Sequence, residues 1–260
     1  MGILNVTPDS FSDGGENLVP AAAVSRALQM EAEGAMMIDI GAESTRPGSQ
    51  GVAPEEQWRR LDPVLKGLRG RLGIPVSVDT TSAWVAGRAA DQGAAVVNDT
   101  SAGLDDPALL GMAAARGLGI VLMHRGGVPK AMPEHAEEGD IVVEVASHLA
   151  GRSRAARDAG IPPRAICLDP GIGFGKSAQQ NLDLFRGLPR ILALGYPVLV
   201  GASRKRFLGE ITGEADPRRR DAASVAAALL AALQGAALVR VHAVRETVAA
   251  LRVAGAAGIR

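Results

Sequence analysis

Residues that can do chemistry follow short apolar segments throughout this chain. The run at residues 166–177, ICLDPGIGFGKS, shows the pattern well: an apolar lead ends at Asp169 and Pro170, and glycines then alternate with Ile172 and Phe174. A P-loop would need glycine at position 170, and a dinucleotide fingerprint would need it at position 176, so the run is neither. Taken alone, it is better explained as an ordinary turn between a strand and a helix.

The other predicted strands end in the same way. Loops between strands and helices are polar in most proteins, so any one such residue is explained by structure alone. Eight strands that all deliver polar groups at one edge of a parallel sheet predict a shared site there. Besides Asp169, the strand ends carry Asn5, Asp39, Asp79, Asn98, His124, Ser203 with Lys205, and Arg240 with His242.

Part of this set suits a planar polar ligand. Asp79, Asn98 and Asp169 offer the mix of donors and acceptors that matches a flat heterocycle with amino, ring N–H and carbonyl groups along its edge. Lys205 would bind ring acceptors or balance carboxylate charge. Two structural alternatives stay open, because Asp79 could cap the following helix and Lys205 could be a solvated loop residue.

A second group, formed by Asn5, Arg46, Arg240 and His242, suits anionic oxygens. Arg240 and His242 share one strand face because they lie two residues apart; a partly buried ion pair is the alternative. The Asn5 carbonyl oxygen can hold Mg²⁺ where ligand phosphates supply the other oxygens.

No His, Cys and carboxylate spacing fits a protein-only zinc site, and His135 and His148 are assigned no role. No nucleophile elbow points to acyl transfer.

Strands alternating with helices would position these residues. The predicted strands are 2–6, 36–40, 76–78, 95–97, 120–123, 166–168, 198–200 and 238–241. The predicted helices are 21–33, 54–72, 82–91, 107–115, 141–159, 180–194, 221–234 and 244–254.

Eight such units predict an α/β fold, a closed (β/α)8 TIM barrel that forms a single domain over residues 1–260. An open doubly wound sheet is the alternative, but no dinucleotide fingerprint or second domain supports it. The uncharged residues 222–239 are interpreted as a buried helix followed by a strand and not as a membrane span. Two polar loops, residues 7–20 and 41–53, are either lids or plain connections.

Composition narrows the function classes. The 260 residues carry a formal net charge of zero, so charge gives no reason to expect nucleic acid or a membrane surface as a partner. The single cysteine, Cys167, fits a reducing compartment, and no signal-like segment opens the chain. We therefore expect a cytoplasmic protein that acts on small molecules.

Motifs along nearly the whole chain resemble those of dihydropteroate synthases, a family of pterin-binding barrels. The first two of these motifs are highly specific, as is the combination of all of them in order. They read GILNVTPDSFSDGG (2–15), DIGAESTRPG (39–48), SVDT (77–80), ND (98–99), LMH (122–124), LDPGIGFGK (168–176), GASRKRFLG (201–209) and RVH (240–242).

The resemblance implies a transferase of folate biosynthesis that uses Mg²⁺. It would join 6-hydroxymethyl-7,8-dihydropterin diphosphate to 4-aminobenzoate and release pyrophosphate, and sulfonamides would compete with 4-aminobenzoate. The catalytic residues implied are Arg46, Asp169, Lys205, Arg240 and His242.

Binding roles carry over by motif in the same way. The pterin would contact Asp79, Asn98, Met123, Asp169, Gly201 and Lys205. The diphosphate would contact Asn5, through Mg²⁺, together with Arg240 and His242. The 4-aminobenzoate pocket would consist of Phe11, Thr45, Arg46, Pro47, Phe174 and Arg206, with Lys205 also at its edge.

The sequence also departs from the family pattern. Ala42 and Arg206 stand where many members have glycine and serine, respectively; an arginine at 206 would still pair with a carboxylate. Members commonly carry a leading segment that closes the barrel floor, and this sequence begins one residue before the first motif.

Two rival functions and an oligomeric state complete the expectations. A pterin-dependent methyltransferase would share the Asp/Asn/Asp edge, but Arg240, His242 and the STRPG loop argue for a diphosphate. A non-catalytic pterin-binding paralogue would have lost the loops, which look complete. The alanine-rich helix at 222–234 and the habit of the family to pair through its last helices predict a homodimer.

Overall fold

Short parallel strands form the centre of the molecule. The computed structural model describes residues 1–6, 18–43, 51–126 and 140–258. Six strands pair in sequence order in one sheet, and two more pair with each other. They are β1 (Gly2–Asn5), β2 (Ile38–Gly41), β3 (Val76–Asp79), β4 (Val96–Asp99), β5 (Gly119–Met123), β6 (Ile166–Asp169), β7 (Leu199–Val200) and β8 (Leu238–Val239).

Two isolated bridges close these sheets into a ring. Leu168 of β6 pairs with Val198, just before β7, and Gly2 of β1 pairs with Val241, two residues after β8; both bridges are parallel. The Ile3 amide donates to the carbonyl of Val241 at 2.9 Å. The closed ring confirms the predicted barrel over an open doubly wound sheet.

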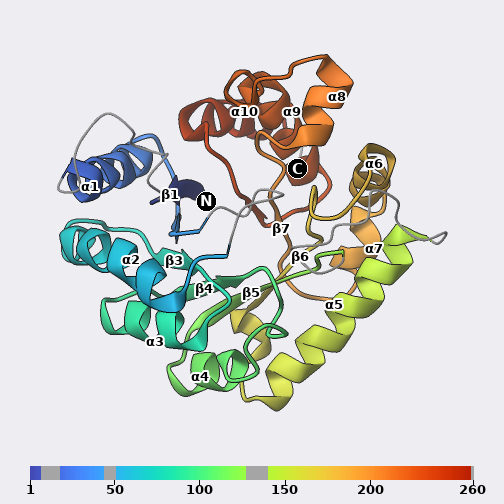
Figure 1. Cartoon of the computed structure of the whole chain (residues 1–260). Helices are drawn as coiled ribbons and strands as arrows, with labels where there is room; N and C mark the ends of the chain where they lie inside the picture. The colour runs from blue at the N-terminus through green and yellow to red at the C-terminus, as the bar shows by residue number, and fades with distance from the viewer. Residues whose placement is uncertain (7–17, 44–50, 127–139, 259–260) are drawn as a thin grey trace.

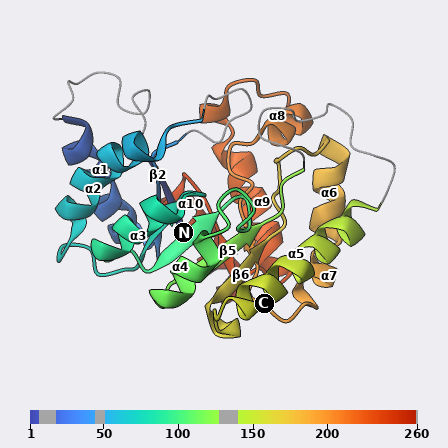
Figure 2. The same ribbon diagram turned by 60° about the horizontal axis from the view of Figure 1, so that its bottom comes forward.

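Helices surround the ring of strands (Figures 1 and 2). The α-helices are α1 (Leu18–Ala32), α2 (Pro54–Leu68), α3 (Ala83–Asp91), α4 (Leu109–Ala115), α5 (Ile141–Asp158), α6 (Ala178–Arg186), α7 (Leu188–Leu192), α8 (Arg206–Thr212), α9 (Asp221–Leu233) and α10 (Val244–Ala256). Short 3₁₀ helices occur at Pro163–Ala165 and Pro217–Arg219. Within the described ranges, no helix is both long and apolar enough to cross a membrane. Residues 222–239 form most of α9, a short connection and β8.

The prediction of eight helices was wrong in two places. The predicted helix 180–194 is split at Gly187, which ends α6 and precedes α7. Pro189 at the start of α7 has no N–H to continue the hydrogen-bond ladder of α6. The structure also adds α8, which is too short for a helical period to show in the sequence; its C-cap, Gly213, has a φ of 75°.

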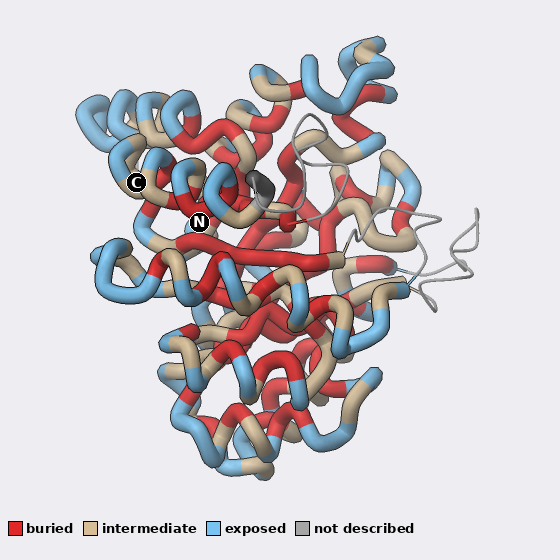
Figure 3. Tube along the Cα trace, turned by 60° about the vertical axis from the view of Figure 1, so that its left-hand side comes forward, coloured by how far each residue is buried: buried red, intermediate tan, exposed pale blue. Residues whose placement is uncertain are grey.

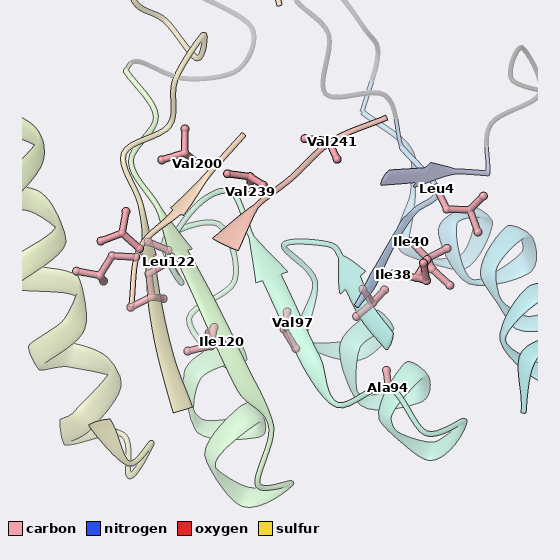
Figure 4. Close-up of a cluster of buried hydrophobic side chains, with 14 of the residues drawn as sticks. Leu4, Ile38, Ile40, Ala94, Val97, Ile120, Leu122, Val200, Val239 and Val241 are labelled. Atoms are coloured by element: carbon pink, nitrogen blue, oxygen red, sulfur yellow. The ribbon is translucent and has the colours of Figure 1, made fainter. Parts of the chain in front are cut away.

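Branched apolar side chains hold the strands together. Figure 3 shows buried residues concentrated along the strands and on the inner faces of the helices. Strands covered on both faces read as nearly continuous apolar runs. This packing fixes the strand ends, where the polar residues begin. Figure 4 shows the cluster, which includes Leu4, Ile38, Ile40, Val97, Ile120, Leu122, Val200, Val239 and Val241.

Candidate active site

Strand register brings the predicted polar residues to one edge of the barrel. Asn5 pairs with Gly41, Gly41 with Asp79, and Asp79 with Asn98. Across the ring, Asp169 at the end of β6 pairs with Met123 at the end of β5. Parallel strands thus place these ends at one common level, as the sequence predicted.

Arg240, which directly follows β8, connects that strand to β2 and β3 at this edge. Arg240 Nε donates to Asp39 Oδ2 at 2.6 Å, and Arg240 Nη2 donates to Asp79 Oδ2 at 2.8 Å. Asn98 Nδ2 donates to the same Asp39 oxygen at 2.9 Å. The ion pair left open by the sequence is therefore present, with Asp39 fully buried. Asp79 does not cap a helix, because Ser82 caps α3.

Burial shifts the pKa values of three groups in this site. It raises the pKa of Asp79 to about 7, against the opposing effect of the Arg240 guanidinium. Burial likewise lowers the pKa of Lys205 to about 7, while the Asp169 carboxylate opposes that change. The pKa of Asp169 is raised, again by burial, with Lys205 acting against it. A ligand that brings charges or hydrogen-bonding groups into this site would therefore change the protonation of these side chains.

The glycine turn, residues 171–175, holds Lys205 in place. Lys205 Nζ donates to the carbonyl oxygen of Ile172 and lies 4.0 Å from the centroid of the Phe174 ring. Gly173 has a φ of 79°, and a Cβ atom there would overlap the Lys205 side chain. Glycine is required here for both backbone conformation and space. Lys205 is thus a packed residue of the site and not a solvated loop lysine.

Two of the residues expected to bind the diphosphate, Asn5 and His242, lie at the end of β1 and shortly after β8, and His242 contacts a neighbouring hydroxyl group. His242 Nδ1 lies 2.9 Å from the hydroxyl of Ser203, which also accepts from the His242 backbone amide at 3.2 Å. Asn5 is partly exposed at the end of β1. The described residues contain no group of three His, Cys, Asp or Glu side chains fit for a metal. An amide oxygen alone fits Mg²⁺ that takes most of its ligands from phosphates and water.

The remaining predicted residues divide into three cases. Met123 is buried, and Gly201 lies against the Arg240 side chain. Arg206 points away from the site, since its side chain is 83% exposed and pairs with Glu210 at 3.1 Å. Four predicted residues and one histidine that was assigned no role lie outside the described residues: Phe11, Thr45, Arg46, Pro47 and His135.

The sequence interpretation missed the roles of three residues. Asp39 is assigned no role from the sequence, although its position at a predicted strand end is a signal that could have predicted its contact with Arg240. Lys176 is buried within the glycine motif, and its partners are backbone carbonyls, which leave no sequence signal. His148, assigned no role, packs edge-to-face against His124 with ring centroids 4.9 Å apart.

Comparison with known proteins agrees with this geometry. The family model described as "Pterin binding enzyme" matches residues 1–242. The dihydropteroate synthase of Neisseria meningitidis serogroup C is 47% identical over 262 aligned positions, which cover 100% of this chain and 92% of that protein.

Solved structures give the same result. A Xanthomonas albilineans dihydropteroate synthase with 4-aminobenzoic acid superposes with a TM-score of 0.94 at 47% identity, covering 100% of this chain and 93% of that one. A Yersinia pestis dihydropteroate synthase in a sulfonamide drug complex gives a TM-score of 0.92 at 41% identity, covering 99% and 93%. The chain therefore belongs to the dihydropteroate synthase family of pterin-binding enzymes.

Proposed function

We propose that this transferase moves the 7,8-dihydropterin-6-ylmethyl group from 6-hydroxymethyl-7,8-dihydropterin diphosphate to 4-aminobenzoate. The methylene C–O bond breaks, the diphosphate leaves with the electron pair, and the amine nitrogen forms a C–N bond and loses a proton. One observation carries the proposal: carboxylates, an amide, a lysine and an arginine meet at a single edge of the barrel. The whole-length likeness to dihydropteroate synthases supports it.

The pterin ring would occupy the buried carboxylate edge. Asp79, Asn98 and Asp169 would bind its amino, ring N–H and carbonyl groups, with Met123 and Gly201 beside the ring and Lys205 at a ring acceptor. The present Arg240–Asp79 ion pair supports an exchange on binding: the pterin N–H groups would take the place of the guanidinium at Asp79. Arg240 would then turn toward the anionic end of the substrate.

Charge on the departing diphosphate would be neutralised by Arg240 and His242, while Asn5 would hold Mg²⁺ against the phosphate oxygens. The ion, when bound, supplies electrostatic stabilisation of the leaving group. Ser203 would orient the His242 imidazole, because its hydroxyl contacts Nδ1 at 2.9 Å. Preorganised positive groups of this kind often supply a large part of the rate enhancement.

The 4-aminobenzoate would bind at Phe174 and Lys205, completed by Phe11, Thr45, Arg46 and Pro47. Lys205 Nζ lies 4.0 Å from the centroid of the Phe174 ring, so a cation and an aromatic ring already lie together, which supports a pocket for an aromatic carboxylate. Arg206 would join this pocket only by leaving Glu210. The nucleophile is a neutral aromatic amine, so no strong base is needed before it attacks. Sulfonamides would compete for the same pocket.

We also propose how the chain is organised. It would act as one cytoplasmic barrel domain of 260 residues and pair as a homodimer through its last helices. Leu230 of α9 and Val253 of α10 are 56% and 70% exposed, which supports a partner surface there. Sedimentation velocity at micromolar concentration tests this proposal, since a single monomer boundary would contradict it.

Product analysis tests the reaction. With pterin diphosphate, 4-aminobenzoate and Mg²⁺, the protein should form dihydropteroate, and Asp79→Asn should raise the KM for the pterin substrate. Asp62→Asn is the matched control, because Asp62 pairs with Lys66 on the surface of α2. Methyl transfer from methyltetrahydrofolate without dihydropteroate formation would favour the methyltransferase rival. Pterin binding with no product would favour the non-catalytic paralogue.

A further inference from the structure

Lys176 has no part in the chemistry above, yet its ammonium group lies inside the protein. The residue is 9% exposed. Its Nζ atom donates to the carbonyl oxygens of Gly171 at 2.9 Å, Phe174 at 3.1 Å and His124 at 3.4 Å. These three acceptors match the three N–H donors of an ammonium. A buried charge is costly unless it is well satisfied, so this arrangement calls for an explanation.

The carbonyls that hold Lys176 belong to the turn that holds Lys205. Within residues 171–175, the carbonyls of Gly171 and Phe174 accept from Lys176, whereas the carbonyl of Ile172 accepts from Lys205. The Phe174 ring also stacks against Lys205. One short turn therefore lies between two ammonium groups, one structural and one in the proposed site.

The turn needs an external support to keep this shape. Gly171, Gly173 and Gly175 all have positive φ angles, of 68°, 79° and 64°, and glycine loses more conformational entropy on ordering than any other residue. Asn181 holds the middle of the turn, where its Oδ1 accepts from the Gly173 amide at 2.6 Å. Lys176 links the carbonyls of Gly171 and Phe174 in the turn to the carbonyl of His124, the residue after β5.

We propose that Lys176 is a positioning residue for Lys205. Its ammonium fixes the carbonyls of the glycine turn, and the turn then fixes Lys205 against Phe174 and Ile172 where pterin and 4-aminobenzoate would meet. This inference rests on the proposed role of Lys205 in that site. Lys176 itself touches neither substrate.

The charge of Lys176 supports this geometry with a second effect. The groups that face it are Asp169 on β6, Glu144 on α5, and the His124 and His148 pair. Burial is the main cause that lowers the pKa of Lys205. Arg240 and then Lys176 lower this pKa further, while the Asp169 and Asp79 carboxylates raise it. Removing the Lys176 charge should therefore raise the pKa of Lys205.

Two substitutions separate shape from charge. Lys176→Met keeps the length of the side chain but removes its charge and its donors, whereas Lys176→Arg keeps the charge with a guanidinium that does not match three converging carbonyls. Lys66→Met is the control, because Lys66 is 60% exposed and pairs with Asp62. For each folded variant, the steady-state constants are measured, together with the pH dependence of Lys205 acetylation by mass spectrometry from about pH 6 to about pH 10.

Lys176→Met should lower kcat/KM for both substrates by about tenfold or more, as expected for a small misplacement of a site residue. Its Lys205 acetylation curve should move to higher pH. Lys176→Arg should lose activity while that curve stays in place, and this variant decides the matter if Lys176→Met does not fold. Lys66→Met should match the wild type.

Full activity in both Lys176 variants, or an unchanged Lys205 curve in a folded Lys176→Met protein, would overturn the inference. The wild-type protein separates this failure from a failure of the proposed function. If it makes dihydropteroate while the variants do so equally well, only the positioning role is wrong. If the wild type makes none, the function itself is wrong, and the acetylation curve still tests the link between Lys176 and Lys205.

Discussion

Arg240 shows how single residues of this site depend on each other. Its guanidinium joins Asp39 at 2.6 Å and Asp79 at 2.8 Å, and only 16% of the side chain is exposed. A buried pair of this kind adds little over an apolar substitute, but removal of one partner leaves a buried charge without compensation. The residue therefore has a structural duty in addition to the proposed catalytic one.

Replacing Arg240 with methionine should lower the free energy of unfolding by about 3–5 kcal/mol at neutral pH, because Asp39 and Asp79 lose their cation. Adding Asp39→Asn to this variant should restore part of that loss. Urea denaturation measures both effects. Arg245→Met is the control, since Arg245 is exposed on α10. An equal cost for Arg240→Met and Arg245→Met would show that the ion pair does not stabilise the fold.

At the scale of elements, the glycine turn is a loop with little freedom to vary. A Cβ atom at Gly171 would overlap the carbonyl oxygen of His124, and one at Gly175 would overlap the carbonyl oxygen of Gly126. Each glycine thus serves a separate close contact of the turn. A side chain at either position would have to displace the main chain that follows β5.

Gly171→Ala tests this reading against a matched position. Gly117 has a φ of 64°, close to the 68° of Gly171, but a Cβ atom at Gly117 would have nothing within 4 Å. Gly117→Ala should cost about 1–2 kcal/mol of unfolding free energy from backbone strain alone. Gly171→Ala should cost clearly more and weaken pterin binding, as followed by thermal unfolding and calorimetry. Equal effects would mean that the close approach to His124 has no energetic weight.

The strands could be predicted well from the sequence, but the contacts between side chains could not. The strand ends were predictable because apolar runs stop at Asp79, Asn98 and Asp169, and parallel register then forces those ends together. The split of the helix at Gly187 was not predicted because the apolar period continues across it. The buried position of Lys176 was not predicted because its partners are main-chain carbonyls, which every residue carries. The resemblance predicts Arg206 in the site because it stands where many family members have a serine, yet at the start of α8 the Arg206 side chain pairs with Glu210 instead.

The whole barrel should be sensitive to acid through His124. This residue follows β5 and is 4% exposed, and burial lowers its pKa to about 3, with Lys176 and His148 acting in the same direction. The Glu144 carboxylate, 3.3 Å from Nε2, favours the charged ring, but it is 61% exposed and screened by water. The neutral imidazole is therefore the native form.

Stability from this group is fully present above the unfolded pKa of 6.5 and is lost as pH falls toward about 3. At pH 5 the loss amounts to about 2 kcal/mol, because only the unfolded state takes up the proton. Urea denaturation at pH 8 and pH 5 should show that His124→Gln loses less stability than the wild type over this range. An identical loss in the two proteins would mean that His124 titrates alike in both states.

At the scale of the whole molecule, we propose that the strand ends form one site that couples diphosphate departure to amine attack. The most direct test is the release of pyrophosphate from the pterin diphosphate in Mg²⁺, with and without 4-aminobenzoate. We predict one pyrophosphate for each dihydropteroate formed, and loss of both products in Arg240→Ala. Tight binding of the pterin substrate without coupled release of pyrophosphate would contradict the proposed reaction.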